Sequence, residues 1–329
     1  MKKRMLILIT IALALTMIIS ACTPKRTTIV VEPTEEEEQV ENNEPVVIGL
    51  SIQSLAWPYM AAYVQNFEAL VAEKEKVTLI TLSADASIEK QTNDINDLIV
   101  QNVDIILVAA LDAQAVVPAI KAAYDAGIPV LAVTAKASED AVPYLVGYSG
   151  PDDYTQGRIA AEIMIEAVGT EGSVVMIEGT AGQSTTQLRA DGFNDVLAEQ
   201  APDLKIIASQ PCDWDPVKEK AAMQTWLNQY GDEIDGVFAQ GGGTSVGEVI
   251  KEAGYSIPVV CTGLRETTYT SILNGIVYGS MSQSPKVDAD QALKLALRIV
   301  NGEELDEFTN IIPMPAVTAA NIDEFEPEY

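Results

Sequence analysis

"DAGIPV" occupies residues 125–130, where it joins the end of an amphipathic segment to the start of an apolar run. "EAGYSIPV", at residues 252–259, repeats this order later in the chain. Glycine commonly follows the last residue of a helix, and proline is tolerated at the first residue of a strand. The two stretches therefore predict helix-to-strand junctions at matching places in two similar arrays.

Short apolar runs rich in β-branched residues alternate with amphipathic segments around each junction. The first array has predicted strands at residues 46–51, 77–82, 104–109, 129–133 and 144–147, and helices at 58–73, 87–101 and 113–126. The second has strands at 173–177, 205–209, 236–239, 258–261 and 277–282, and helices at 154–168, 185–199, 216–229, 245–253 and 267–273. Continuous apolar strands are typical of parallel sheets buried on both faces. The chain is therefore predicted to be an α/β protein with two doubly wound parallel sheets.

The first 45 residues have a different character. A basic start precedes an uncharged apolar run over residues 5–21, which predicts a secretory signal peptide at 1–21. Cys22 directly after Ile-Ser-Ala resembles a lipoprotein signal, which implies lipidation of Cys22; a single transmembrane anchor is the alternative, although the run is short. Residues 22–45 contain four consecutive glutamates and no apolar periodicity, so we expect an acidic disordered tether. The folded part is thus expected outside the cytoplasm, lipid-anchored to the cell membrane.

Composition excludes several kinds of chemistry. The formal net charge of −28 argues against nucleic acid or an anionic lipid surface as a partner. The chain has no histidine, so Ser-His or Cys-His nucleophiles and histidine metal sites are excluded. The acids of "GPDD", residues 150–153, lack the spacing of a calcium loop, and we expect no metal or cofactor. Cys212 and Cys261 end strands that are not neighbours, so they are predicted to be free thiols.

Ligands of such sheets bind beyond the carboxyl ends of the strands. The loops concerned are residues 53–59, 134–137, 179–184, 211–215, 241–244 and 262–266. One of them begins "GTAGQSTTQLRADGF", residues 179–193, which is rich in glycine. It lacks both the Gly-Lys-Ser/Thr of a P-loop and the three spaced glycines of a dinucleotide fingerprint. A phosphate site is therefore not predicted there.

Seven motifs at or between these loops, in order along the chain, resemble those of the type 1 periplasmic sugar-binding proteins, the ribose-binding-protein-like substrate-binding subunits of ABC transporters. They are "SLAWPYM" (54–60), "IPVLAVTAKA" (128–137), "GPDDYTQGRIAAE" (150–162), "GTAGQSTTQLRADGF", "QPCDWDPVK" (210–218), "DGVFAQGGG" (235–243) and "MSQSP" (281–285). The resemblance implies two lobes, residues 46–149 with 284–311 and residues 150–283 with 312–329. It also implies a hinge of three crossovers, near residues 148–151, 283–285 and 311–315, about which the lobes close on a ligand.

The resemblance further implies which residues bind the ligand. They are Trp57, Tyr59, Met60, Thr134, Gln187, Arg189, Trp214, Gly241, Gly263 and Gln283. Trp57 has an alternative place as a surface or lobe-packing residue. Thr134, Gly241 and Gly263 stand where the ribose binders have larger polar residues, which predicts a ligand larger or less hydroxylated than ribose. Aromatic side chains suit sugars because the C–H faces of a sugar pack on the rings.

Three functions follow from these patterns. The first is a solute-binding protein that captures a small polar ligand, a monosaccharide or related polyol, and delivers it to an ABC permease. The second is the ligand-binding component of a sensor kinase or chemoreceptor system. The third, a glycan hydrolase, would need two facing carboxylates, for which Asp213, Asp215 and Glu178 are candidates. The first is the prediction, and no enzymatic activity is expected.

Overall fold

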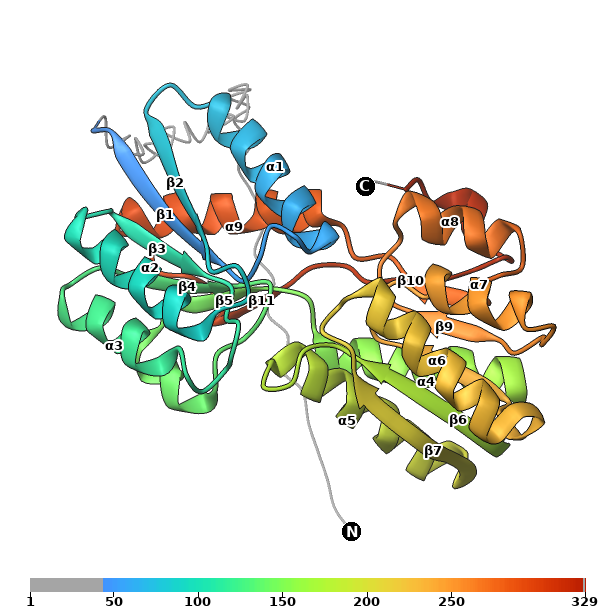
Figure 1. Cartoon of the computed structure of the whole chain (residues 1–329). Helices are drawn as coiled ribbons and strands as arrows, with labels where there is room; N and C mark the ends of the chain where they lie inside the picture. The colour runs from blue at the N-terminus through green and yellow to red at the C-terminus, as the bar shows by residue number, and fades with distance from the viewer. Residues whose placement is uncertain (1–43, 328) are drawn as a thin grey trace, which may run out of the picture. The chain divides into compact units, whose positions relative to one another are not determined.

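The computed structural model describes residues 44–327 and 329, which form two six-stranded sheets flanked by helices (Figure 1). The predicted signal peptide, Cys22 and residues 22–43 of the predicted tether lie outside the described residues. Within the described part of the chain, no helix is long and apolar enough to cross a membrane. We call each sheet with its helices a lobe.

The first sheet has the strand order β11-β5-β4-β3-β1-β2, and every neighbouring pair is parallel. Its elements are β1 (Val46–Ile52), α1 (Pro58–Ala72), β2 (Val77–Ser83), α2 (Ile88–Val100), β3 (Ile105–Val108), α3 (Val117–Asp125), β4 (Val130–Val133), η1 (Glu139–Tyr144), β5 (Gly147–Gly150), α9 (Pro285–Val300) and β11 (Thr309–Ile311). Ile105 and Leu107 of β3 pack in the core under α1 and α9. Ile106 and Val108 pack on the opposite face, under α2 and α3. The two-residue period of a strand thus divides this lobe into two apolar layers.

The second sheet has the order β12-β10-β9-β8-β6-β7, and only β12 runs antiparallel to its neighbour. Its elements are α4 (Asp153–Val168), β6 (Glu171–Glu178), α5 (Ser184–Gln200), β7 (Asp203–Pro211), α6 (Pro216–Tyr230), η2 (Gly231–Glu233), β8 (Gly236–Ala239), α7 (Thr244–Glu252), β9 (Val259–Cys261), α8 (Glu266–Leu273), β10 (Gly279–Met281), β12 (Ala316–Thr318) and η3 (Ile322–Glu324). Residues of α4 and α5 cover one face, and residues of α6, α7 and α8 cover the other. The predicted fold class is therefore confirmed.

Both quoted junctions have the expected geometry. Gly127 follows α3 with φ of 81°, and Gly254 follows α7 with φ of 85°. Open space surrounds the position of a Cβ at either glycine, so crowding is not the reason for glycine here. The reason is the left-handed backbone conformation, which residues with a side chain adopt only at a cost. The two lobes thus share the same local device for turning a helix into the next strand.

The chain passes between the sheets three times, after β5, after β10 and after β11. The passing segments are residues 151–152, 282–284 and 312–315, beside or within the predicted crossovers. All three lie close to the carboxyl ends of strands. The passages therefore leave the loops at those ends free to form a site.

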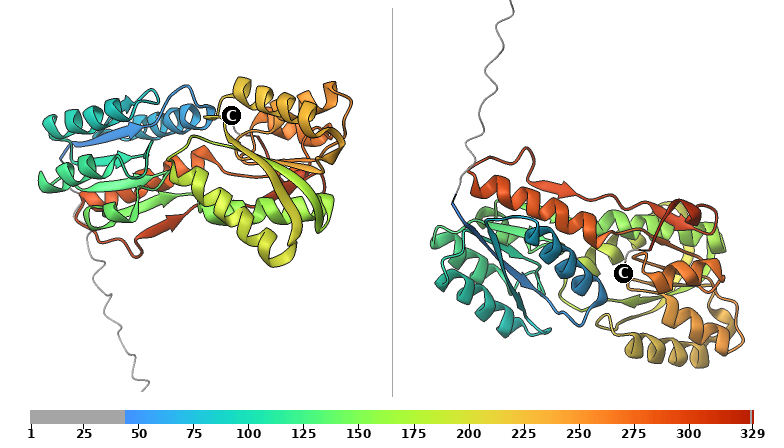
Figure 2. Two further views of the ribbon diagram at one scale, coloured as in Figure 1. Left: turned by 60° about the horizontal axis from the view of Figure 1, so that its bottom comes forward. Right: turned by 90° about the horizontal axis from the view of Figure 1, so that it is seen from above.

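One strand begins later than predicted, and helix α9 and the short strands β11 and β12 were not predicted. The predicted strand at 144–147 begins only at Gly147, because Tyr144 ends η1 and its ring packs edge-on against Tyr124, with centroids 5.5 Å apart. Helix α9 was not predicted, although Ser284 caps it by accepting from the Val287 N–H at 3.0 Å and a proline follows in the first turn. Helices α1 and α9 lie side by side on the first sheet (Figure 2).

Cys212 and Cys261, the cysteines among the described residues, are both free and buried, as predicted. Cys212 follows the edge strand β7, and Cys261 ends β9. Strands β6 and β8 lie between β7 and β9, which keeps the thiols on separate parts of one apolar layer. Burial raises the pKa of Cys212 to about 11, so this thiol is poorly reactive.

Candidate ligand-binding site

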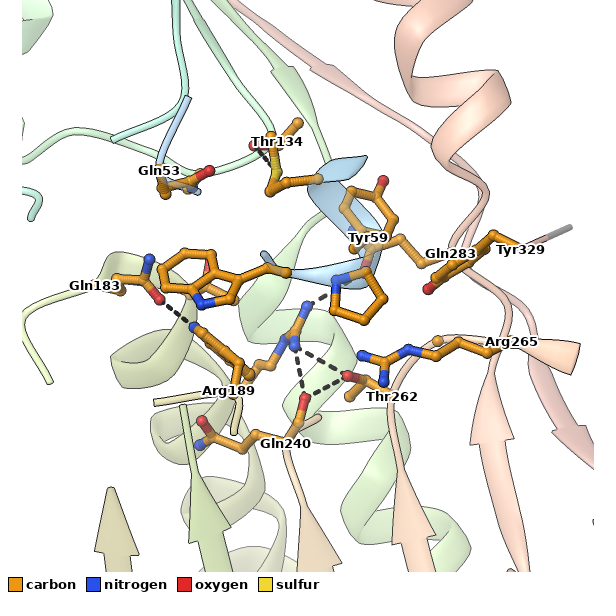
Figure 3. A pocket seen from close by; sticks show the side chains of 17 residues that line it. Gln53, Tyr59, Thr134, Gln183, Arg189, Gln240, Thr262, Arg265, Gln283 and Tyr329 are labelled. Carbon is orange, nitrogen blue, oxygen red and sulfur yellow. Dashed lines mark hydrogen bonds between the residues drawn. The ribbon is translucent and has the colours of Figure 1, made fainter. Parts of the chain in front are cut away.

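A pocket lies where the carboxyl ends of the two sheets meet, and Figure 3 shows the 17 residues that line it. The first lobe contributes Gln53, Trp57, Pro58, Tyr59, Met60, Thr134 and Ala135, and the second contributes Gln183, Thr185, Arg189, Trp214, Gln240, Thr262, Gly263, Arg265 and Tyr329, with Gln283 between them. The pocket has an empty volume of about 650 Å³, the part open to solvent included. Clefts between two lobes are frequent places for small-molecule sites.

The first lobe presents the start of α1 to the pocket. Pro58 begins this helix, and Tyr59 in its first turn donates its hydroxyl to Asp288 Oδ2 of α9 at 2.8 Å. This bond fixes the ring of Tyr59 in the wall of the pocket. Thr134 lies opposite, with φ of 56°, a left-handed conformation that a β-branched residue seldom adopts. Such backbone strain is concentrated at binding sites because the surrounding structure must impose it.

Asp288 supports Tyr59 from a fully buried position. Burial is the main cause that raises the pKa of its carboxyl, to about 8. The hydrogen bond from the Tyr59 hydroxyl lowers this pKa, and the nearby charge of Asp153 raises it. Its Oδ1 atom has no hydrogen-bond partner among the described residues. The carboxyl therefore carries a proton over much of the neutral range, which reduces the cost of burying it.

Arg189 of α5 is the centre of the hydrogen-bond network in the second lobe. Its Nε donates to Asp153 Oδ1 at 3.1 Å and to Gln156 Oε1 at 2.8 Å. Its Nη1 donates to the carbonyl of Gln240 at 2.8 Å and to Thr262 Oγ1 at 3.0 Å. Its Nη2 donates to Gln283 Oε1 at 3.2 Å and lies 3.1 Å from Asp153 Oδ1. All three guanidinium nitrogens thus have acceptors within the protein.

The partner of this guanidinium, Asp153, has a fully buried side chain in the first turn of α4. Burial raises the pKa of its carboxyl, and the charge of Arg189 opposes that shift. The other carboxylate oxygen accepts from the Thr185 hydroxyl at 3.0 Å. A buried pair of this kind is satisfied only while both members are present. The pair therefore links the start of α4 to the floor of the pocket.

Trp214 forms an aromatic wall of the second lobe. Its Nε1 donates to Gln183 Oε1 at 2.7 Å, and the Arg189 guanidinium lies 5.8 Å from its ring. A Cβ on Gly179 would lie only 1.9 Å from the indole, so the absence of a side chain there makes room for the ring. The glycine-rich loop that begins at residue 179 is thus explained by the indole that it accommodates.

Arg265 and Tyr329 occupy one side of the pocket, at the right of Figure 3. Arg265 precedes α8, and Tyr329 is held there because its carbonyl accepts from the Glu266 N–H at 2.9 Å. The Tyr329 ring meets Tyr59 edge-on, with centroids 6.0 Å apart, so it touches both lobes. Burial raises the pKa of Tyr329, and the charge of Arg265 opposes this shift.

The structure brings most of the predicted site residues to this pocket. Eight line it: Trp57, Tyr59, Met60, Thr134, Arg189, Trp214, Gly263 and Gln283. Gly241 lies behind the wall, where a Cβ would be 3.5 Å from Trp214. Gln187 is not brought to the pocket, because it is exposed on α5 and donates to Asp191 at 2.7 Å.

The prediction missed several residues that line the pocket. Gln53, Gln183 and Arg265 fall in loops that the sequence marked, but nothing in a single loop shows which side chain turns inward. Tyr329 follows η3 and carries no sequence signal, since only the fold brings it to Tyr59. Asp213, Asp215 and Glu178 do not line the pocket, and none of its 17 described lining residues is acidic. The two facing carboxylates of a glycan hydrolase are therefore not found in the pocket wall.

Comparison with known proteins identifies the family. Residues 48–304 match the periplasmic binding protein domain, and the chain belongs to this family. It is 31% identical over 255 residues to the xylitol-binding protein of Mycolicibacterium smegmatis, covering 77% of this chain and 72% of that protein. It is 27% identical over 311 residues to the ribose import binding protein of Bacillus subtilis, covering 93% and 96%.

A solved structure confirms the fold. The solute-binding protein of an ABC transporter from Bacillus halodurans C-125, with bound myo-inositol, superposes with a TM-score of 0.81. The two chains are 22% identical, and the match covers 88% of this chain and 100% of the other. The resemblance inferred from the loop motifs is thus confirmed at the level of family and fold.

Proposed function

We propose that this protein is an extracytoplasmic solute-binding protein that captures a monosaccharide or polyol between its lobes and delivers it to an ABC importer. The observation that carries the proposal is the pocket itself. Aromatic rings from both lobes line it together with amide, hydroxyl and guanidinium groups. Rings pack on the C–H faces of a sugar while the polar groups pair with its hydroxyls. The relatives named above, which bind xylitol and ribose by name, support the same class of ligand.

The proposal also states which residues contact the ligand and how the protein is attached to the membrane. The eight predicted residues at the pocket, with Gln53, Gln183 and Thr262, would contact the ligand. The protein would perform no catalysis. The signal sequence would be removed before Cys22, and the lipidated cysteine would hold the protein at the outer face of the cell membrane. A permease of an ABC transporter would then receive the ligand from the tethered protein.

A thermal-shift screen against pentoses, hexoses, polyols and sugar acids tests the proposal. A ligand at a hundred times its dissociation constant stabilises the folded state by about 2.7 kcal/mol, which corresponds to a rise of several degrees in the unfolding midpoint. An unchanged midpoint with every compound at 10 mM, roughly a hundred times a typical weak dissociation constant, would contradict it. Release of nitrophenol from nitrophenyl glycosides would instead favour a hydrolase.

Uptake measurements separate transport from sensing. A strain lacking the protein should lose uptake of the ligand that the screen identifies, and restored expression should recover it. Normal uptake together with a lost transcriptional response to the ligand would favour the sensor alternative.

A further inference from the structure

The pocket contains a second arginine whose environment differs from that of Arg189. Arg265 lies half-buried beside Gly263, and its Nε is shut off from solvent without a hydrogen-bond partner among the described residues. A Cβ on Gly242 would lie 2.8 Å from Nη1, so the glycine provides the space in which this guanidinium lies. A buried donor without an acceptor is unfavourable, which indicates a group that a ligand completes.

The charges around the pocket also differ between the two arginines. Arg189 is compensated by Asp153, whereas no described acidic residue lies within ion-pair distance of Arg265. The acid behind this side of the pocket is Glu219, which accepts from Ser245 at 3.0 Å and lies beneath Gly241. Burial raises the pKa of Glu219, and Arg265 opposes that shift only in part. The pocket wall therefore carries one positive charge that no ion pair compensates.

The chain as a whole is strongly acidic, but this does not oppose a local anion site. Charges separated by more than about 8–10 Å are largely screened at physiological ionic strength. The groups in contact with the ligand therefore determine the sign that it must have. At the pocket wall these groups include two arginines and, among the lining residues described, no acidic side chain.

Two further polar groups define what else the ligand must carry. The Tyr329 hydroxyl lies next to Gly263, 2.9 Å from the position of a Cβ there, on the same side of the pocket as Arg265. Gln53 lies toward the opposite corner of the view in Figure 3. Its Nε2 donates to the carbonyl of Ala110 at 3.4 Å, while its buried Oε1 has no donor in the part of the chain that is described. The Nε of Arg265 thus lacks an acceptor, and the Oε1 of Gln53 lacks a donor.

We infer that the ligand is a hydroxylated carboxylic acid of monosaccharide size, such as a uronic or aldonic acid, whose carboxylate binds Arg265 and the Tyr329 hydroxyl. A hydroxyl at the far end of the ligand donates to Gln53. Guanidinium and carboxylate are well matched because their N–H and oxygen atoms form parallel charge-assisted bonds. This inference rests on the proposed function, since it specifies the ligand of the same pocket.

Matched pairs of compounds test the inference. The purified protein is titrated calorimetrically with D-glucuronate and D-glucose, D-galacturonate and D-galactose, and D-gluconate and D-glucitol, at pH 7.5 and equal ionic strength. At least one acid should bind ten- to a hundredfold more tightly than its neutral partner, the factor expected for a charge-assisted contact. Tighter binding of the neutral partners would overturn the inference and leave the proposed function intact. Binding of no compound in either set would also overturn the inference, whereas the proposed function, which includes pentoses and pentitols, would be decided by the thermal-shift screen.

Two variants assign the contact. Arg265→Gln should lower the affinity for the acid ten- to a hundredfold and reduce the ratio of acid affinity to neutral affinity. Tyr329→Phe keeps the ring against Tyr59 and should lower acid affinity about two- to tenfold through the lost hydroxyl. Arg158→Gln, on the exposed face of α4, is the control and should change neither affinity. Unchanged acid affinity in both pocket variants would overturn the assignment.

Discussion

The most informative perturbation of this fold is the replacement of Arg189 by methionine. The side chain is only 6% exposed and its partner Asp153 is fully buried, so the variant leaves a carboxylate in the protein interior with the Thr185 hydroxyl as its remaining donor. Removing one member of a buried ion pair costs about 3–5 kcal/mol of unfolding free energy. Urea unfolding at pH 7.5, monitored by tryptophan fluorescence, should show a loss of this size.

The pH dependence of that loss identifies its cause. Burial already raises the pKa of Asp153, and removal of the Arg189 charge raises it further. A carboxyl with a raised pKa takes up a proton on folding, so its penalty is absent below the unfolded pKa of about 4 and grows as the pH rises. The loss in Arg189→Met should therefore be larger at pH 8 than at pH 5. It should grow by about 1.4 kcal/mol for each pH unit between the folded pKa of Asp153 in wild type and its higher folded pKa in the variant.

Two comparisons make the result decisive. Arg158→Met removes a partly exposed pair with Glu199 and should cost less than about 1 kcal/mol. The double variant Asp153→Asn with Arg189→Met removes both charges and should be more stable than Arg189→Met alone. A loss below about 1 kcal/mol in Arg189→Met, or the same loss at pH 5 and pH 8, would refute the role given to this pair.

Three further predictions concern other parts of the molecule. Gly179→Ala should displace the indole that lies 1.9 Å from the new Cβ and weaken ligand binding at least about tenfold by calorimetry; wild-type affinity would contradict the close packing. The pKa of Asp288 is raised to about 8, so wild type should lose about 1.4 kcal/mol of unfolding free energy per pH unit between about pH 5 and 8. Asp288→Asn removes this titration, and its stability relative to wild type should rise by the same amount per pH unit. Urea-unfolding free energies of the two proteins that run parallel with pH would count against this prediction. Cys22→Ser should abolish precursor processing and membrane association in cell fractionation, and unchanged fractionation would exclude the lipid anchor.

Most strands and helices could be predicted from the sequence because buried parallel strands are continuous apolar runs and each lobe repeats one junction. Strand β8 has the predicted bounds, Gly236 to Ala239, and α2, Ile88 to Val100, differs from the predicted helix at 87–101 by one residue at each end. Strands β11 and β12 were not predicted, since three-residue strands that pair with distant partners have too few residues to show a period. Their pairing partners, β5 and β10, fix them instead.

The site was predicted in part. Tyr59 and Trp214 were found because they stand in motifs shared with a family, and the pocket includes both. The role of Arg189 within the protein was not predicted, because all five of its hydrogen-bond partners lie more than thirty residues away in sequence, and only folding brings them together. Arg265 and Tyr329 were missed for the same reason, since residues 59, 265 and 329 come together only in the folded chain.

The central claim is that one ligand is held by both lobes at once. Calorimetric titration of Trp57→Ala in the first lobe and Trp214→Ala in the second, with the ligand identified by screening, tests it most directly. Both tryptophans line the same pocket, so each variant should lose at least about tenfold in affinity through lost aromatic packing. Wild-type affinity in either variant would contradict the claim, because the ligand would then be bound by one lobe alone.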